Sequence, residues 1–132
     1  NADGERRADF PGGWPGDQKN AFTGKGLTEK ETEAQRFLKQ LLNIRKYTPA
    51  FHKGKLIHFV PDKGVYVYFR ILDKEKYMIV LNKNPNAVDL DPTRYKEMID
   101  GITQFKDLIK DTSVERAQAL HIEPKNFSIL KF

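Results

Sequence analysis

The 132-residue sequence predicts a mainly β protein, an antiparallel β-sandwich that follows a long loop and one amphipathic α-helix. Three observations support this fold class. Residues 1–26 have neither helical nor strand periodicity, residues 28–46 place apolar side chains at helical spacing, and from Gly54 onward the period changes to two. Short strands at close spacing, joined mostly by turns, are typical of an antiparallel sandwich.

The opening loop, residues 1–26, is interrupted by Pro11, Pro15 and several glycines. A segment of this length without secondary structure is uncommon in a compact domain and is usually functional or a linker. Linkers are poor in large aromatic side chains, yet this loop contains Phe10, Trp14 and Phe22. Such side chains need a partner surface, so the loop is the first place to look for function.

A helix is predicted to begin at Thr28 and to end before Pro49. The run T-E-K-E at residues 28–31 is a capping box, in which the first and last side chains hydrogen-bond each other's backbone amides. Pro49 disfavours helical backbone at Thr48. One apolar stripe follows the spacing i, i+3, i+4, i+7 and i+8, at Ala34, Phe37, Leu38, Leu41 and Leu42.

The remainder predicts strands joined by turns, with one brief helix. Asp91-Pro92 has the form of an N-cap followed by proline at the first helical position, so a short helix is expected over 92–98. In the strand 65–71, Tyr66 and Tyr68 alternate with apolar residues and therefore share one face. The predicted strands are 56–60, 65–71, 77–82, 87–90, 105–109, 114–117, 119–122 and 127–132, with turns at 61–64 and 73–76.

Composition argues against several classes, and a nucleic-acid binder driven by the net charge is kept as a third, disfavoured hypothesis. The net charge is +5, but the 23 basic residues are interleaved with 18 acidic ones, which favours a mixed solvated surface over a nucleic-acid site. Cysteine is absent, so neither disulfides nor thiolate zinc sites are expected. No run reaches the roughly 20 apolar residues of a membrane span, and residues 1–6 lack the apolar region of a signal peptide. The absence of cysteine does not determine the cellular compartment.

No catalytic or metal-binding residue is predicted. His52, His58 and His121 are scattered, without a second ligand at metal-binding spacing. There is no G-x-S-x-G nucleophile motif, and the glycines lack phosphate-loop spacing. A carboxylate pair for glycoside hydrolysis would have to come from Asp9 and Asp17, and two loop aspartates are weak evidence.

Sugar binding has a stronger physical basis. Flat aromatic faces stack on sugar rings while charged side chains hydrogen-bond the hydroxyls, so Arg7, Asp9 and Trp14 form a candidate set. The alternative is that Trp14 and Phe10 only anchor the loop. The face with Tyr66 and Tyr68 has two interpretations as well: a stacking platform, or a sheet face covered by the helix or by another domain.

Four stretches together resemble the C-terminal end of α-amylase-family glycoside hydrolases. They are R-x-D-F-P-G-G-W at 7–14, N-A-F-T-G at 20–24, E-A-Q-R-F-L-K-Q-L-L-N-I-R-K at 33–46 and G-K-L-I-H-F-V-P-D-K-G-V-Y-V-Y-F-R at 54–70. The sequence is most similar to the neopullulanase and cyclomaltodextrinase group, especially its starch-utilisation members in Bacteroides-like bacteria.

The resemblance implies a catalytic (β/α)₈ barrel followed by domain C, a Greek-key antiparallel sandwich. Residues 1–26 then correspond to the loop after the last barrel strand, 27–50 to the last barrel helix and 51–132 to domain C. Loops at this face of a barrel build the active site. In the isolated chain, the resemblance predicts a loop that is poorly ordered or held by non-native contacts.

For function, the resemblance implies a non-catalytic domain that stabilises the barrel of an α-glucan hydrolase. The family's nucleophilic aspartate, acid/base glutamate and third aspartate lie upstream, so this chain alone is expected to be inert. Arg7, Asp9 and Trp14 would bind substrate only in the intact parent. No cofactor is expected; calcium, which the resemblance allows for the parent, has no visible ligand set here.

The expected partners are the barrel of the same polypeptide and, through it, an α-glucan, with neither nucleic acid nor membrane. The resemblance favours a periplasmic location, and a cytoplasmic one stays open. A stand-alone carbohydrate-binding sandwich, with Tyr66 and Tyr68 as its platform, is the alternative function.

Overall fold

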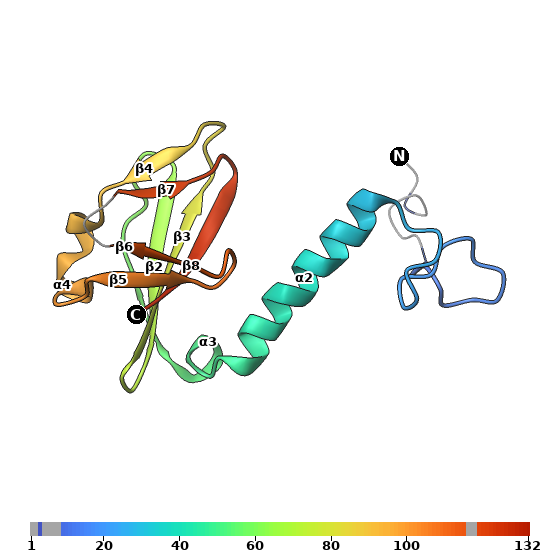
Figure 1. Cartoon of the computed structure of the whole chain (residues 1–132), viewed down its shortest axis with the longest axis horizontal. Helices are drawn as coiled ribbons and strands as arrows, with labels where there is room; N and C mark the ends of the chain where they lie inside the picture. The colour runs from blue at the N-terminus through green and yellow to red at the C-terminus, as the bar shows by residue number, and fades with distance from the viewer. Residues whose placement is uncertain (1–2, 4–8, 116–118) are drawn as a thin grey trace. The chain divides into compact units, whose positions relative to one another are not determined.

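The computed structural model describes residues 3, 9–115 and 119–132. The chain forms two compact units, Asn1–Leu42 and Asn43–Phe132 (Figure 1). The boundary between them lies inside the long helix α2, Glu29–Tyr47. The first unit therefore contains the opening loop and the first turns of the helix, and the second contains all the strands.

Helix α2 is formed as the sequence predicts. Thr28 precedes it, acidic residues occupy its first turn and basic residues its last, which suits the helix dipole. None of its residues is buried: even the apolar side chains of Phe37, Leu38 and Leu42 are 39%, 55% and 56% exposed. The apolar stripe thus exists but lies largely in solvent.

A second, unpredicted helix, α3, covers Ala50–Lys53 directly after α2. Pro49 ends one helix and begins the next: its φ of −53° suits a helix start, where its missing N–H costs nothing. Ala50 is fully buried, and its carbonyl accepts a 3.0 Å hydrogen bond from Arg70 Nε. Helix α3 is therefore packed onto the strands of its own unit.

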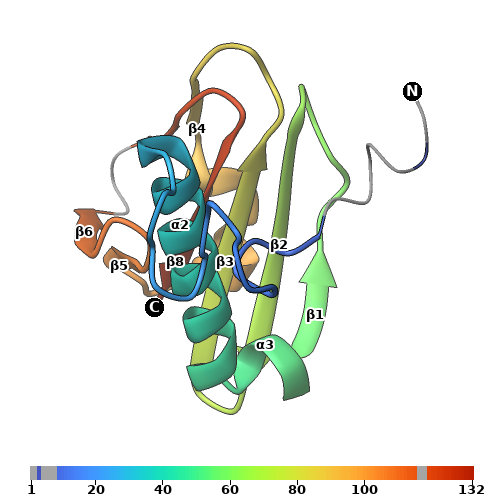
Figure 2. The same cartoon turned by 90° about the vertical axis from the view of Figure 1, so that its right-hand side faces the viewer.

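The second unit is a two-layer antiparallel sandwich, which confirms the predicted fold class. The larger layer, sheet A, has six strands in the order β1-β2-β3-β8-β5-β6, and Figure 2 shows β1, β2 and β3 side by side. Strand β8 lies between β3 and β5, so the spatial order departs from chain order. The strands of sheet A are β1 Lys55–His58, β2 Val65–Leu72, β3 Glu75–Asn82, β5 Gln104–Asp107, β6 Thr112–Glu115 and β8 Asn126–Lys131.

The smaller layer, sheet B, is the antiparallel pair β4 Val88–Leu90 and β7 Leu120–Ile122. The 3₁₀ helix η1, Pro92–Tyr95, and helix α4, Lys96–Ile99, follow β4. Asp91 caps η1, because its carboxylate accepts a 2.9 Å hydrogen bond from the Thr93 amide. The predicted N-cap and proline at 91–92 are thus confirmed, although the helix begins as a 3₁₀ turn.

Two tight turns set the register of β2. The turn before it is closed by Lys63 and Gly64, with φ of 45° and 79°. A Cβ on Gly64 would lie 2.3 Å from the Asn84 side chain, so this turn needs glycine. The turn after β2 contains only two residues, because Leu72 pairs with Glu75. The predicted four-residue turn at 73–76 is therefore too long: Glu75 joins β3, where it pairs with Lys131 at 2.9 Å.

The core lies between the sheets. Val67 and Phe69 of β2 and Met78 and Val80 of β3 point into it, opposite the fully buried Tyr95. The ring of Phe59 packs edge-on against that of Tyr95 at 4.9 Å. The alternation predicted for β2 is confirmed, since its other side chains lie on the opposite face of sheet A.

Most predicted strand boundaries differ from the observed ones by one or two residues. The difference is largest for the hairpin β5–β6, where strand residues were expected at 105–109 and 114–117. Asp107 explains the early end of β5: its buried carboxylate accepts hydrogen bonds from the amides of Ile109 and Lys110 at 2.8 and 3.1 Å. Residues 116 and 117 of the second predicted strand lie outside the described residues.

Candidate functional site

The opening loop folds on itself through a turn around Trp14. The carboxylate of Asp17 accepts hydrogen bonds from the amides of Gly12 and Trp14, at 2.8 and 3.1 Å. The Gly13 amide donates to the Phe10 carbonyl at 3.2 Å. An aspartate that accepts from nearby backbone amides replaces the hydrogen bonds that a regular element would supply. Asp17 therefore has a structural role in this turn.

A second turn surrounds Asn20. Its side-chain oxygen accepts hydrogen bonds from the backbone amides of Phe22 and Thr23, both at 2.9 Å. Its backbone amide donates to the Lys25 carbonyl at 2.8 Å. The Ala21 amide donates to the Pro11 carbonyl at 3.0 Å and joins the two turns. The side chains of Asp17 and Asn20 thus satisfy several backbone amides within residues 9–26.

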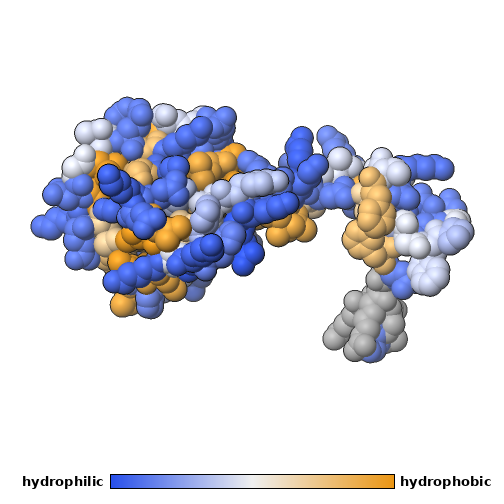
Figure 3. Space-filling view, turned by 90° about the horizontal axis from the view of Figure 1, so that it is seen from below, coloured by the Kyte–Doolittle hydropathy of each residue, from blue (hydrophilic) through white to orange (hydrophobic). Residues whose placement is uncertain are grey.

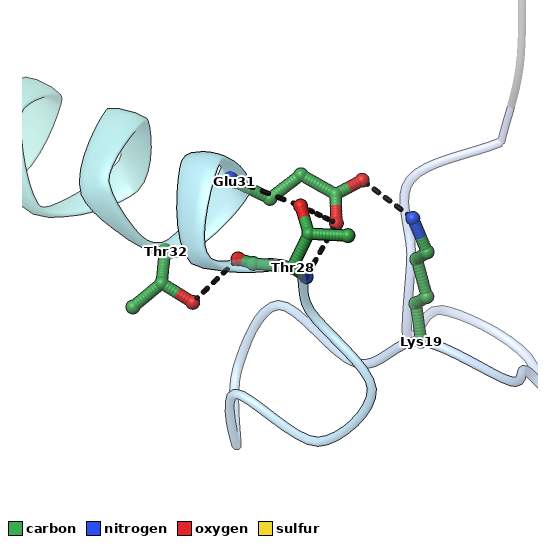
Figure 4. Close-up of polar contacts among 4 residues, drawn as sticks. All are labelled: Lys19, Thr28, Glu31 and Thr32. Carbon is green, nitrogen blue, oxygen red and sulfur yellow. Dashed lines mark hydrogen bonds and ion pairs between the residues drawn. The ribbon is translucent and has the colours of Figure 1, made fainter.

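The helix start holds the loop from the other side. The Glu31 carboxylate accepts from the Thr28 amide at 2.8 Å, and the Glu31 amide donates to the Thr28 hydroxyl at 3.3 Å (Figure 4). This is the predicted capping box. Lys19 Nζ adds a 2.6 Å ion pair to the same carboxylate, and Gln35 donates to the Ala21 carbonyl at 2.6 Å.

These contacts change the titration of Glu31. The hydrogen bond from Lys19, followed by those from Thr28, lowers the pKa of Glu31 from its ordinary 4.5 to about 2. Each partner stabilises the ionised carboxylate, which is why the pKa falls. The Glu31 carboxylate therefore stays ionised to lower pH than an ordinary glutamate.

The structure describes two of the three predicted substrate-binding residues. Arg7 lies outside the described residues. Asp9 is exposed, and Trp14 is 66% exposed while its backbone is held by Asp17. Phe10, the second aromatic side chain of the loop, packs edge-on against Phe22 at 5.4 Å. Figure 3 shows hydrophobic side chains at the surface of the loop as well as of the sandwich.

The exposed side chains of Asp9 and Trp14 have the chemistry that sugar binding uses. A tryptophan face held on an ordered turn is suited to stacking on an apolar ring, and Asp9 could accept hydrogen bonds from hydroxyls. Among the described residues, no group of three or more histidine or carboxylate side chains could hold a metal ion. Within the same residues, none of the helices meets the length and hydropathy that crossing a bilayer requires.

Sequence reasoning missed the structural side chains of the loop. It weighed Asp17 as a catalytic carboxylate and gave Asn20 no role. The available signal was their position: an aspartate and an asparagine, each within a few residues of glycines, are typical turn residues. The Gln35 contact with the Ala21 carbonyl had no such local signal, because the two are 14 residues apart.

The second candidate surface is on the opposite face of sheet A from the core. The rings of Tyr66 and Tyr68 are 5.6 Å apart and inclined by 33°, and His58 packs edge-on against Tyr66 at 6.3 Å. Both tyrosines are half-buried, and burial raises the pKa of the Tyr68 hydroxyl. The predicted tyrosine pair therefore exists as a contiguous aromatic surface.

Known proteins resemble the chain in fold. A solved structure of AmyP in complex with maltose is 18% identical with a TM-score of 0.68 over 82% of this chain and 22% of its own. An Anoxybacillus α-amylase is 14% identical with a TM-score of 0.61 over 81% and 24%. MutB in complex with the substrate sucrose is 26% identical with a TM-score of 0.60 over 74% and 17%.

The chain thus spans only 17 to 24% of the length of these three structures. The likeness is one of fold, over 74 to 82% of this chain. A family model gives the assignment itself, because it matches residues 56–131, which is more than half of the sequence. The chain belongs to the family of cyclo-malto-dextrinase C-terminal domains.

Proposed function

We propose that this chain is the C-terminal part of an enzyme that hydrolyses α-glucosidic bonds in starch-derived substrates, of the neopullulanase or cyclomaltodextrinase type found in Bacteroides-like bacteria. The single observation that carries the proposal is the family match at residues 56–131 to the C-terminal domain of cyclo-malto-dextrinase. The quoted sequence motifs support the finer grouping. The related structures, of which this chain covers about a fifth, support a larger parent.

In this proposal the chain has three parts. Residues 1–26 are the loop after the last barrel strand, 27–50 the last barrel helix and 51–132 domain C. The exposed stripe of α2 supports this division, since Leu38 and Leu42 are more than half exposed. An apolar helix face of this kind needs a partner surface, and the barrel would supply one. Domain C would then stabilise the barrel.

The chain itself has no catalytic role in the proposal. The parent would use two carboxylates in a retaining mechanism, one as nucleophile and one as acid and then base. Arg7, Asp9 and Trp14 would line the sugar site at the barrel face. The exposed indole of Trp14 supports this role, because it is held on an ordered turn and stays available for stacking. No cofactor is proposed for this chain, and a periplasmic parent is favoured.

The test compares the 132-residue chain with the polypeptide that includes its upstream part. Both are assayed on pullulan, starch and cyclodextrins. We expect turnover by the longer polypeptide alone, and Trp14→Ala in it should raise KM more than it lowers kcat, because stacking contributes to binding in both ground and transition states. Reproducible turnover by the isolated chain would overturn the proposal.

A stand-alone carbohydrate-binding sandwich is the second candidate, favoured by the 5.6 Å Tyr66–Tyr68 pair. Titration of the isolated chain with maltooligosaccharides tests it. Saturable binding that is lost in both Tyr66→Ala and Tyr68→Ala would support this function, and absence of binding would exclude it. Trp14→Ala in the same chain is the control for binding through the loop.

A further inference from the structure

The turn that follows helix α4 contains an aspartate directly before a glycine. Asp100 has a φ of −61° and a ψ of 137°, and Gly101 has a φ of 74°. The Ile102 amide donates to the Ile99 carbonyl at 3.1 Å and closes the turn. These angles and this hydrogen bond match a type II turn, whose third residue needs a positive φ and is usually glycine. Asp100 and Gly101 are therefore the two central residues of the turn.

The peptide group between Asp100 and Gly101 is accessible and can rotate. Both residues are exposed. The hydrogen bond that closes the turn spans this peptide group without using it, and within the described part of the chain the Gly101 amide makes no hydrogen bond. A Cβ built on Gly101 would meet no atom of a neighbouring segment within 4 Å. The amide nitrogen of Gly101 can therefore turn toward the Asp100 side chain.

An aspartate in this setting can react with its own backbone. The Gly101 nitrogen attacks the side-chain carboxyl carbon of protonated Asp100: a new N–C bond forms, and the carboxyl hydroxyl leaves with the amide proton as water. Water then opens the cyclic imide that results. Addition at the former backbone carbonyl breaks the original peptide bond and leaves the chain linked through the side-chain carbon, which is isoaspartate. Addition at the other carbonyl restores aspartate, and neither route needs an oxidant or a reductant.

Other aspartates of the sandwich lack one of these conditions. Asp91 precedes Pro92, which has no N–H that could attack. Asp107 is buried, and the amide that follows it, that of Leu108, donates to the Ile129 carbonyl at 2.8 Å. Asp100 combines an exposed carboxyl group with a following amide that is neither crowded nor hydrogen-bonded.

We propose that Asp100 is a site of spontaneous isomerisation in the folded chain, with water as the only other reactant. The proposal does not depend on the proposed function, because it uses only the turn after α4. Its second part is that the product weakens the sandwich. Ile99 is fully buried in the core, and Ile102 packs against the same core. Isoaspartate adds a methylene to the main chain between these two residues, and a close-packed core does not absorb such a change without loss.

Ageing of the 132-residue chain at neutral pH in heavy-oxygen water tests the first part. Trypsin in ordinary water then releases the peptide 97–106, which follows Lys96 and ends at Lys106. We expect a second form of this peptide that elutes separately and carries heavy oxygen, and electron-transfer fragmentation should place its isoaspartyl link at Asp100. Absence of this form from the folded chain would overturn the proposal, whether or not the urea-unfolded chain forms it.

Two variants test which atoms react. Asp100→Glu keeps the charge and should abolish the product, because the longer side chain would have to close a larger ring. Gly101→Asn keeps a residue type that accepts the positive φ of this turn, and it should slow the reaction because its side chain crowds the nitrogen. The other Asp-Gly pair, at residues 3–4, should react at the same rate in all three chains. Equal rates for peptide 97–106 in the three chains would overturn the proposal.

Thermal unfolding after ageing tests the second part. The aged unmodified chain should contain a fraction that melts at a lower temperature, and this fraction should grow with the measured isoaspartyl content. The aged Asp100→Glu chain should melt like a fresh sample. Unchanged melting of the unmodified chain after isoaspartate has formed would overturn the second part and leave the assignment of the site in place.

Discussion

The two units of this chain are stabilised by different interactions. In Asn1–Leu42, none of the described residues is buried, and the backbone is held by Asp17, Asn20 and the capping box at Thr28. In Asn43–Phe132, a continuous core fills the space between two sheets. A single hydrogen bond within the protein adds about 0.5–1.5 kcal/mol to the free energy of unfolding. A buried phenylalanine side chain adds several times more.

This difference implies a hierarchy. Substitutions in the core should unfold the sandwich as a whole, while substitutions in the first unit should alter local structure and leave the strands intact. It also agrees with the proposed roles of the two units, since a loop without a core can change its conformation when it meets a partner. The predictions below test this hierarchy from the largest expected effect to the smallest.

Phe69→Ala should have the largest effect. Phe69 is fully buried, and its ring packs on those of Phe59, Tyr95 and Phe132. Removing a buried aromatic ring costs about 3–5 kcal/mol through lost contacts and a cavity. The loss of free energy of unfolding is measured by thermal unfolding, monitored through the circular dichroism signal of the strands.

The control for Phe69→Ala is Tyr47→Ala, which removes an aromatic ring that is 72% exposed. It should change the free energy of unfolding by no more than about 0.5 kcal/mol. Similar losses in both variants would mean that the strands are not stabilised by this core, and the contrast between the units would be wrong.

Asn82→Ala should have the next largest effect, because Asn82 links the two sheets. Its side-chain nitrogen donates to the carbonyls of Asn86, Ile122 and Glu123 at 3.0, 3.2 and 3.1 Å. Loss of the side chain leaves the carbonyl of the buried Ile122 without this donor, at a cost of about 1–3 kcal/mol. Urea denaturation measures it, with the exposed Asn86→Ala as control. An unchanged midpoint would show that water replaces the amide.

Thr28→Ala tests the first unit, with an expected loss of about 1 kcal/mol of helix stability. The hydroxyl that accepts from the Glu31 amide is removed, so the first turn of α2 should fray. Ellipticity at the helical minimum should fall, while the melting of the strands should not change. Thr28→Ser keeps the hydroxyl and should retain the helix. A coupled loss of strand signal would show that the units are not independent.

A pH titration tests the charge on the same junction. The pKa of Glu31 falls to about 2 in the folded chain, mainly through Lys19. A carboxylate whose pKa falls on folding stabilises the folded form above its unfolded pKa, and the stabilisation is lost as the pH drops toward 2. Helical signal should therefore decrease between about pH 4.5 and 2. Lys19→Met should move this decrease to higher pH, and an unchanged curve would contradict the assignment.

Patterns in the sequence predicted the helix and the strands better than they predicted the contacts of the loop. The capping box, the stop at Pro49 and the alternation of Tyr66 and Tyr68 depend on neighbours along the chain, which a pattern can show. The contact of Gln35 with the Ala21 carbonyl and the pairing of Glu75 with Lys131 depend on the folded chain. For that reason the length of the turn at 73–76 was not predictable, and the expectation of a poorly ordered loop stays a prediction. The substrate role of Asp9 and Trp14 stays a prediction.

Asp17→Ala should have the smallest effect on global stability, and it separates local order from the sandwich. It removes the acceptor for the amides of Gly12 and Trp14. Since Trp14 and Asp17 are exposed, the free energy of unfolding of the strands should change by less than about 0.5 kcal/mol. Amide exchange at Gly12 and Trp14 should become faster, because their hydrogen bonds to Asp17 are lost. Asp17→Asn keeps a side-chain acceptor and should keep most of the protection. Equal exchange in Asp17→Ala and the unmodified chain would show that Asn20 alone holds the loop.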